Sequence, residues 1–252
     1  PTGDALRVAD YFFEAGGRVV NIVMQDYYQR WYYPSRTAEE YINEAVIPIV
    51  TAVKEFKDQW AAAHPGENPD EKFIYIPYNE PEQNNTRYPQ LLSNNQTGRN
   101  SRAVFNNDWL AVTNKIKEID PGALISGPNL TQYSNVFMDD FIAFCVEHDC
   151  LPNVVSWHLL WAKAFLQTGP NITAFRALEA KYEPIYLEKY PDRESPFPLK
   201  VDINEYAAQE EIAVGGSLIQ YIARYDEQKM NSMLPYWNTA NSYGSLLAGQ
   251  NE

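Results

Sequence analysis

The stretch "KFIYIPYNEPEQNN", residues 72–85, decides how the rest of the chain is interpreted. Its first half is an apolar run of strand length, and the run ends abruptly in Asn79, Glu80 and Pro81. Proline cannot continue a strand and favours an extended conformation in the residue before it, so we expect an extended Glu80 at the strand end. The stretch therefore predicts a buried strand that presents a carboxylate at its carboxyl end.

Apolar strands and helices alternate along the whole chain. Strands are expected at residues 18–24, 73–78, 123–126, 154–157, 199–203 and 232–236. Helices are expected at residues 4–15, 37–63, 101–119, 136–147, 172–190 and 210–229, the second of them opened by a capping box of Thr37 and Glu40. Short strands that are apolar on both faces, with helices between them, are typical of a parallel sheet with crossover helices.

Two α/β folds share this pattern, the doubly wound sheet and the (β/α)8 TIM barrel. No Gly-x-Gly-x-x-Gly or phosphate-binding loop follows an expected strand, which disfavours the nucleotide-binding doubly wound sheet. Polar and aromatic residues instead follow strand after strand, as in "QDYYQRWYY", "WHLLW", "NEYAA" and "YWNTANSY". Because barrel active sites are built from the carboxyl ends of the strands, this distribution favours the barrel.

The pattern accounts for about six of the eight strands that a barrel requires, and we assign them as strands 3 to 8. We therefore expect one catalytic barrel domain over residues 1–252 that is truncated at both ends. Two strands before Asp4 and a helix after Glu252 would complete it. Because six strands leave apolar edges uncovered, we expect residues 1–252 not to fold stably alone. Expression of this segment tests the expectation, and a soluble monomer with one sharp thermal transition would contradict it.

Composition narrows the possible partners. The 252 residues carry a net charge of −13, which repels phosphate backbones and anionic lipids, so no nucleic acid or membrane partner is expected. No run of 18 apolar residues occurs, so no membrane-spanning segment is expected. Aromatic residues make up 14% of the chain, which suits both an ordinary core and the binding of sugar rings.

Two further features bear on cofactors and location. Cys145, His148 and Cys150 lie close together in the sequence, but their spacing matches no usual zinc pattern. One buried helix thiol and one thiol at the helix end explain the cysteines more simply. No metal and no cofactor is therefore expected. Four N-x-Thr sequons, a weak indication of a secreted or extracellular protein, begin at Asn84, Asn95, Asn129 and Asn171.

Glu80 and Glu205 form a matched pair, because "IPYNEP" ends one expected strand, "VDINEY" ends another, and Asn precedes Glu in both. A single strand-end glutamate is more often a surface acid or an ion-pair partner. Two carboxylates on separate strands facing one cleft are what glycoside hydrolysis requires. One protonates the leaving oxygen, while the other attacks the anomeric carbon or activates water there.

With these motifs the chain resembles the catalytic barrel of the retaining glycoside hydrolases of clan A, and most closely family 39, which contains β-xylosidases and α-iduronidases. "NEP", residues 79–81, is similar to the acid/base motif of the fourth barrel strand, and "VDINEY", residues 201–206, to the nucleophile segment of the seventh. "FMDDFIAFCVEHDCLPNVVSWHLLW", residues 137–161, resembles the fifth helix and the sixth strand, where a histidine follows the strand. The first two strands of the family pattern are absent.

The resemblance implies a role for each catalytic glutamate. Glu80 would be the general acid of the first step and the general base of the second, and Glu205 the nucleophile that forms a covalent glycosyl-enzyme. Asn79 would hydrogen-bond the sugar 2-hydroxyl, although a strand-end cap is the alternative. His158 would steady a carboxylate or a sugar hydroxyl, with a structural histidine as the alternative.

Aromatic residues at the strand ends would complete the substrate site. Trp237 could be the platform under the sugar ring, although a tryptophan there could also be core. Trp31 and Tyr206 are further candidates for substrate contact, and an oligosaccharide or polysaccharide is the expected partner. The alternatives that remain open are an inactive carbohydrate-binding barrel and a clan A endo-glycanase of another family. A blind pocket would indicate exo action and an open groove endo action.

Overall fold

Six parallel strands form one sheet in the order of the chain. The computed structural model describes residues 5–24, 36–83, 87–206, 211 and 215–235. The strands are β1 (Val20–Val23), β2 (Phe73–Ile76), β3 (Leu124–Leu130), β4 (Val154–Leu159), β5 (Lys200–Tyr206) and β6 (Ser232–Pro235).

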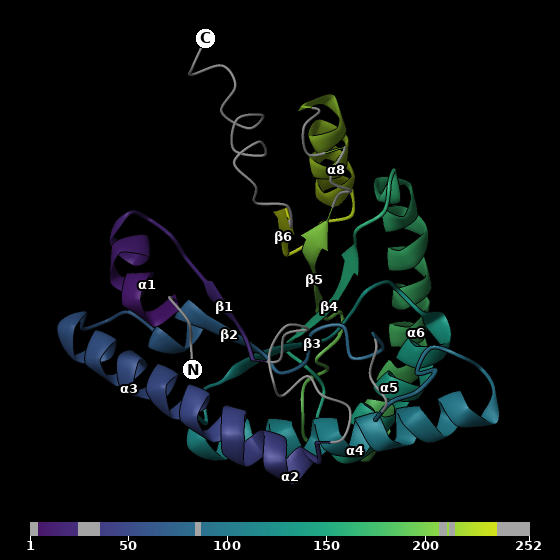
Figure 1. Ribbon diagram of the computed structural model, residues 1–252, viewed down its shortest axis with the longest axis horizontal. Coiled ribbons are helices and arrows are strands. Elements are labelled where there is room, and N and C mark those ends of the chain that lie inside the picture. The colour runs from purple at the N-terminus through teal and green to yellow at the C-terminus, as the bar shows by residue number, and fades with distance from the viewer. Residues whose placement is uncertain (1–4, 25–35, 84–86, 207–210, 212–214, 236–252) are drawn as a thin grey trace.

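Helices connect the strands and cover the outer side of the sheet, which curls into part of a barrel (Figure 1). They are α1 (Ala5–Glu14), α2 (Ala38–Tyr41), the π-helix η2 (Ile42–Val46), α3 (Ile47–Ala63), η3 (Pro69–Lys72), α4 (Gln96–Ile119), α5 (Asn135–His148), η4 (Ala164–Gln167), α6 (Thr168–Lys189) and α8 (Gly215–Glu227). The expected parallel sheet with crossover helices is confirmed, and it fits a partial (β/α) barrel. Among the described residues, no helix is both long and apolar enough to cross a membrane.

Side-chain caps set where the helices begin. The Thr37 hydroxyl accepts a hydrogen bond from the Glu40 N–H at 3.2 Å, and Glu40 accepts one from the Thr37 N–H at 2.8 Å, so the expected capping box is confirmed. α4 begins at Gln96, earlier than the expected residue 101, because the Asn95 side chain accepts from the Gly98 N–H at 2.8 Å. A single capping asparagine thus adds a full turn to the helix.

Aromatic packing places the end of β2 against the helices. Tyr78, two residues before Glu80, lies 5.1 Å from the Phe105 ring of α4. Trp109 of α4 in turn makes an edge contact with Phe141 of α5 at 5.2 Å. These side chains are fully buried and make edge or tilted ring contacts, which are favourable for aromatic pairs. The chain that carries Glu80 is therefore anchored on a rigid core.

β3 continues to Leu130, beyond the expected end at residue 126. Gly127 lies within this extension, and a Cβ there would come within 2.5 Å of the Trp109 ring. Glycine is therefore required for α4 to pack this closely on β3.

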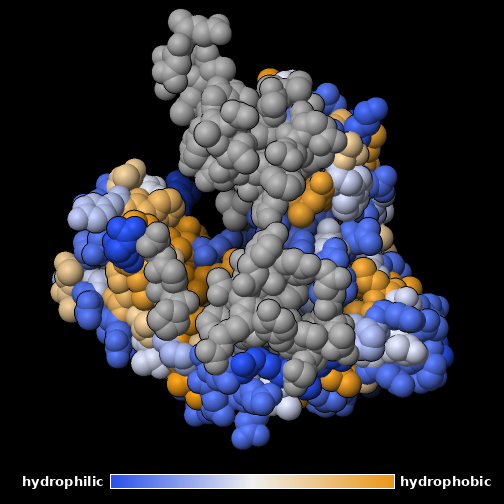
Figure 2. Space-filling view, in the orientation of Figure 1, coloured by the Kyte–Doolittle hydropathy of each residue, from blue (hydrophilic) through white to orange (hydrophobic). Residues whose placement is uncertain are grey.

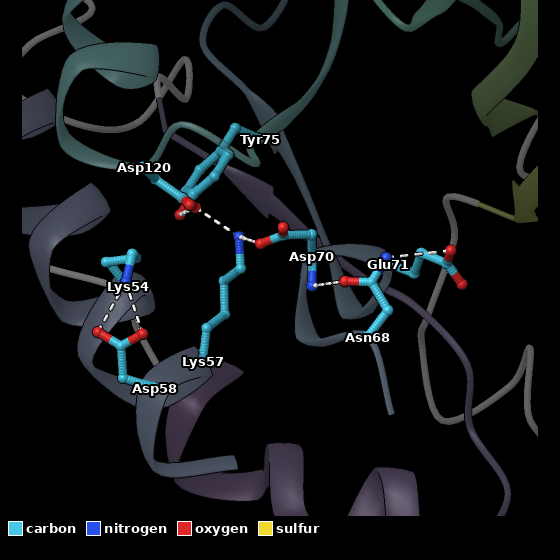
Figure 3. A network of polar contacts seen from close by, with 8 residues as sticks. All are labelled: Lys54, Lys57, Asp58, Asn68, Asp70, Glu71, Tyr75 and Asp120. Carbon is cyan, nitrogen blue, oxygen red and sulfur yellow. Dashed lines mark hydrogen bonds and ion pairs between the residues drawn. The ribbon is translucent and has the colours of Figure 1, made fainter. Parts of the chain in front are cut away.

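A buried ion-pair network lies before the amino ends of the strands (Figure 3). Lys57 of α3 is 1% exposed, and its ammonium lies 2.6 Å from Asp120 and 2.6 Å from Asp70. Tyr75 of β2 donates a hydrogen bond to the same Asp120 oxygen at 2.9 Å. Because Asp120 precedes β3 and Asp70 precedes β2, Lys57 joins one outer helix to the starts of two adjacent strands.

The sheet has two edges, β1 and β6, and the surface beside β1 is apolar (Figure 2). Val19 and Val23 are 40% and 46% exposed at this edge. The neighbouring helix α1 also exposes large apolar side chains: Val8, Tyr11 and Phe12. Contiguous apolar surface at a sheet edge is a contact area for further structure.

Replacing Lys57 tests the network. Lys57→Met should lower the free energy of unfolding by about 3–5 kcal/mol, because Asp120 would keep a buried charge without its partner. Lys54→Met is the matched control on the same helix, since Lys54 pairs with Asp58 at the surface, and should change it by less than about 1 kcal/mol. Urea denaturation of the full-length variants measures both values. Equal effects of the two substitutions would contradict the assignment of Lys57 as a buried structural cation.

Candidate active site

Glu80, His158 and Glu205 meet at the carboxyl ends of three strands. Glu80 follows β2, His158 lies near the end of β4, and Glu205 lies near the end of β5, directly paired with His158 in the register of the sheet. One ligand atom from each of the three lies within 4.8 Å of the others. The curvature of the sheet thus brings together two glutamates that are carried by strands separated by two others.

His158 lies between the two carboxylates. Its Nδ1 is 2.9 Å from Glu80 Oε1 and 3.4 Å from Glu205 Oε2, and its side chain is fully buried. The side chains of Glu80 and Glu205 are 16% and 20% exposed, so both remain accessible at the carboxyl ends of the strands. Nδ1 is thus within hydrogen-bonding distance of Glu80 and close to Glu205, while Nε2 has no partner among the described residues.

The backbone at Glu80 differs from the expected extended conformation. Its φ is +48°, in the left-handed region, which is uncommon for a glutamate and more so before a proline. The Glu80 N–H donates to the Asn129 carbonyl at 2.9 Å, and the Glu80 carbonyl accepts from the Gln83 N–H at 2.9 Å. These two bonds stabilise a turn that overrides the local preference, and such strained positions are common in active sites.

Three asparagines form a hydrogen-bonded chain beside the glutamates. Asn204 Nδ2 donates to Asn129 Oδ1 at 2.8 Å, and Asn129 Nδ2 donates to Asn79 Oδ1 at 2.7 Å. Asn129 is 1% exposed, whereas Asn79 and Asn204 are each 7% exposed. Sequence reasoning identified Asn79 only, because the contact depends on long-range pairing of three strands.

Both additional asparagines are bulge residues. Between β3 and β4 the register steps from Pro128 to Leu130, which leaves Asn129 as the extra residue. Between β4 and β5 it steps from Ile203 to Glu205, which leaves Asn204 as the extra residue. Bulges of this kind re-aim side chains next to active sites.

Glu82 is a third carboxyl group, two residues after Glu80. Its Oε1 accepts hydrogen bonds from the N–H and the hydroxyl of Thr131 at 2.7 and 2.5 Å, while its Oε2 is buried without a partner among the described residues. Burial raises the pKa of Glu82, and the bonds from Thr131 partly offset this effect. Sequence reasoning missed Glu82, which is an ordinary loop acid by its pattern.

Tyr206 packs against α8. It is 5% exposed, and its ring lies 5.0 Å from Tyr221 and 5.5 Å from Tyr225 of that helix. That Tyr206 contacts substrate stays a prediction. Trp31 and Trp237 lie outside the described residues.

The donor set of Glu80, His158 and Glu205 has the composition and proximity of a metal-binding group. Cys145, His148 and Cys150 form no such group in the part of the chain that the structure describes. Both thiols are free and buried, and the His148 ring packs on Phe144 at 4.1 Å. The explanation of the cysteines as helix-end core residues agrees with this placement.

Comparison with known proteins finds relatives among the glycosidases. No family model matches the chain. The 3-O-β-L-arabinopyranosyl-α-L-arabinofuranosidase of Bifidobacterium pseudocatenulatum is 25% identical over 297 residues, covering 100% of this chain and 28% of the relative. The 3-O-α-D-galactosyl-α-L-arabinofuranosidase of Bifidobacterium longum subsp. longum is 22% identical over 289 residues, covering 100% of this chain and 24% of the relative. The chain thus spans about a quarter of the length of these curated relatives.

A solved structure from Neocallimastix frontalis has the same fold. It superposes with a TM-score of 0.63 at 23% identity, over 93% of this chain and 49% of that protein.

Glu82→Gln tests the buried carboxyl. Because folding raises the pKa of Glu82, the folded state binds the Glu82 proton more tightly than the unfolded state does. The stability that protonated Glu82 contributes at acid pH is therefore lost as pH rises above the ordinary glutamate pKa. Relative to the wild type, Glu82→Gln should gain stability in thermal unfolding as pH rises above the ordinary glutamate pKa of about 4.3, and the gain should level off once Glu82 is ionised in the folded state. Thr131→Val, which removes a hydrogen bond to the charged form, should steepen the loss with rising pH. A pH-independent difference between Glu82→Gln and the wild type would show that folding leaves the pKa of this carboxyl unchanged, which would contradict the raised pKa.

Proposed function

We propose that the protein is a glycoside hydrolase that cleaves O-glycosidic bonds by double displacement, with Glu80 as acid/base and Glu205 as nucleophile. The observation that carries the proposal is the meeting of these carboxylates at the carboxyl ends of separate strands, with His158 between them. The names of the curated relatives, both glycosidases, support it independently.

The separation of the carboxylates favours retention over inversion. Oxygens of Glu80 and Glu205 lie within 4.8 Å of each other. Retaining enzymes place their carboxyl groups about 5–5.5 Å apart, whereas inverting enzymes need about 6.5–9.5 Å to admit a water molecule. Oxygens this close are on the retaining side of these ranges and support direct attack by Glu205.

Each group then has one task per step. Glu80 donates a proton to the leaving oxygen while Glu205 attacks the anomeric carbon, and the C–O bond to the leaving group breaks as the glycosyl-enzyme ester forms. Glu80 then takes a proton from water, the water oxygen attacks the same carbon, and Glu205 is released as a carboxylate. His158 holds the two carboxylates at a fixed separation, and Asn79 offers its amide to the 2-hydroxyl.

The relatives indicate the substrate class. Both are named as α-L-arabinofuranosidases acting on arabinofuranosyl units that carry a sugar at O3. We extend this to the present protein: its substrate is an oligosaccharide or polysaccharide with a 3-O-substituted α-L-arabinofuranosyl unit. Membership of clan A and of family 39 is part of the same proposal, as is a secreted or extracellular location, where such polysaccharides occur.

The fold proposal is a complete eight-stranded barrel. The described strands correspond to strands 3 to 8, and the exposed apolar surface at β1, with Val19 and Val23, is where a preceding strand would pair. Two strands between β1 and β6 would close the sheet and cover this surface. Residues 1–252 would then form most of one catalytic domain.

Two substitutions test the catalytic roles. Glu205→Ala should lower turnover of every substrate by at least about 10⁴-fold, because no covalent intermediate can form. Glu80→Ala should still release an activated phenol, since a good leaving group needs little proton assistance, and azide should restore the second step by replacing activated water. The measurement is 4-nitrophenol release from aryl α-L-arabinofuranosides by the full-length protein.

Glu118→Ala, an exposed glutamate of α4, is the control and should retain wild-type turnover. Identical behaviour of Glu80→Ala and Glu205→Ala on activated substrates, with no glycosyl azide formed, would refute the assigned roles. Activity on aryl β-xylosides alone would refute the substrate class and leave the mechanism intact.

A further inference from the structure

We propose that Asn129 is a positioning residue for the proposed glycosidase reaction, acting through both Glu80 and Asn79. The inference rests on the function proposed above. In this proposal, Asn129 orients the backbone of Glu80, the acid/base. It also sets which side of the Asn79 amide faces the substrate.

The first part of the argument is the backbone contact. The Asn129 carbonyl accepts the Glu80 N–H at 2.9 Å, which holds Glu80 in its left-handed conformation. Asn129 is itself left-handed, with φ of +59°. Asparagine is among the few residues that adopt this region readily, so its presence at the bulge allows the carbonyl to point at Glu80.

The second part is the direction of the side-chain bonds. Asn129 accepts from Asn204 and donates to Asn79, so the Asn79 carbonyl oxygen is turned toward Asn129. The Asn79 NH2, which can only donate, takes no part in this chain of amides and is the group we assign to the ligand. A sugar 2-hydroxyl beside the reacting carbon would therefore accept from Asn79, and successive donated bonds along the chain strengthen one another.

The third part is burial. Asn129 is 1% exposed, so it does not touch a substrate and acts through its neighbours. The same burial removes Asn129 as a glycosylation site in the folded protein, although Asn129-Leu130-Thr131 has the sequence of a sequon. The conformational requirement and the amide chain account for an asparagine at this position without any glycan.

Asn129→Gly isolates the side chain. Glycine accepts the left-handed conformation, so the carbonyl bond to Glu80 is kept while the amide contacts are lost. In the full-length protein, kcat on an aryl α-L-arabinofuranoside should fall by roughly 10–100-fold with KM changed less than about threefold, as expected for a contact that strengthens in the transition state. Unchanged kcat would overturn the proposal.

Asn129→Asp tests the direction of the chain. A charged aspartate cannot donate to Asn79, whereas a protonated one donates and accepts as asparagine does. The ratio of variant to wild-type kcat should therefore rise toward one as pH falls. If the chain ran in the opposite direction, the introduced carboxylate would accept from Asn79 as the amide oxygen did, and a ratio near one at all pH values would overturn the assignment.

A stability measurement keeps this inference separate from the proposed function. Because Asn129 and Asn79 are in contact, the Tm changes of Asn129→Gly and Asn79→Ala should not add in the double variant. Additive Tm changes would show that the contact is absent and overturn the inference. If the wild type cleaves no glycoside while the Tm changes are non-additive, the proposed function fails and the contact that positions Asn79 stands.

Discussion

The contact of His158 with Glu80 and Glu205 is the interaction on which the site depends. The chain carries a net charge of −13, and two carboxylates at this separation repel each other in a partly buried setting. A donor placed 2.9 Å from one and 3.4 Å from the other offsets that repulsion while leaving both side chains partly exposed. His158 is fully buried on β4, so its position is set by the sheet and not by a loop.

Both the regular strands of the sheet and its bulges position these groups. In a regular parallel ladder, alternate residues of a strand face opposite sides, and Asn204 and Glu205 would point apart. The extra residues at Asn129 and Asn204 change this alternation just where the site begins. The bulges also explain how the amide of Asn79, which follows β2, meets the amides of Asn129 on β3 and Asn204 on β5 across the end of the sheet.

Sequence was sufficient for the features that have local signals. The pattern of apolar runs located all six strands, and the strand-end positions located Glu80, Glu205 and His158, which the structure brings together. Asn129 was missed because a left-handed bulge has no apolar period, and its only visible pattern was a sequon. Tyr206 follows Glu205 on β5, so alternation along the strand places its ring on the opposite face, against Tyr221 of α8.

The buried ion-pair network lies at the amino ends of the strands, and the candidate catalytic residues lie at the carboxyl ends. At the amino ends, Lys57 is bonded by both Asp70 and Asp120, and Tyr75 adds a further bond to Asp120, so the buried cation is well compensated. At the carboxyl ends, Glu80 adopts a strained conformation. Among the described residues, Glu82 Oε2 there and Asp120 Oδ1 at the amino ends are each buried without a partner. Strain and uncompensated burial cost free energy, and they persist where the surrounding fold is rigid enough to impose them. The rings of Phe105 and Trp109, which pack behind β2 and β3, supply that rigidity. The strand that begins beside the Lys57 network can therefore hold Glu80 in a strained turn after its other end.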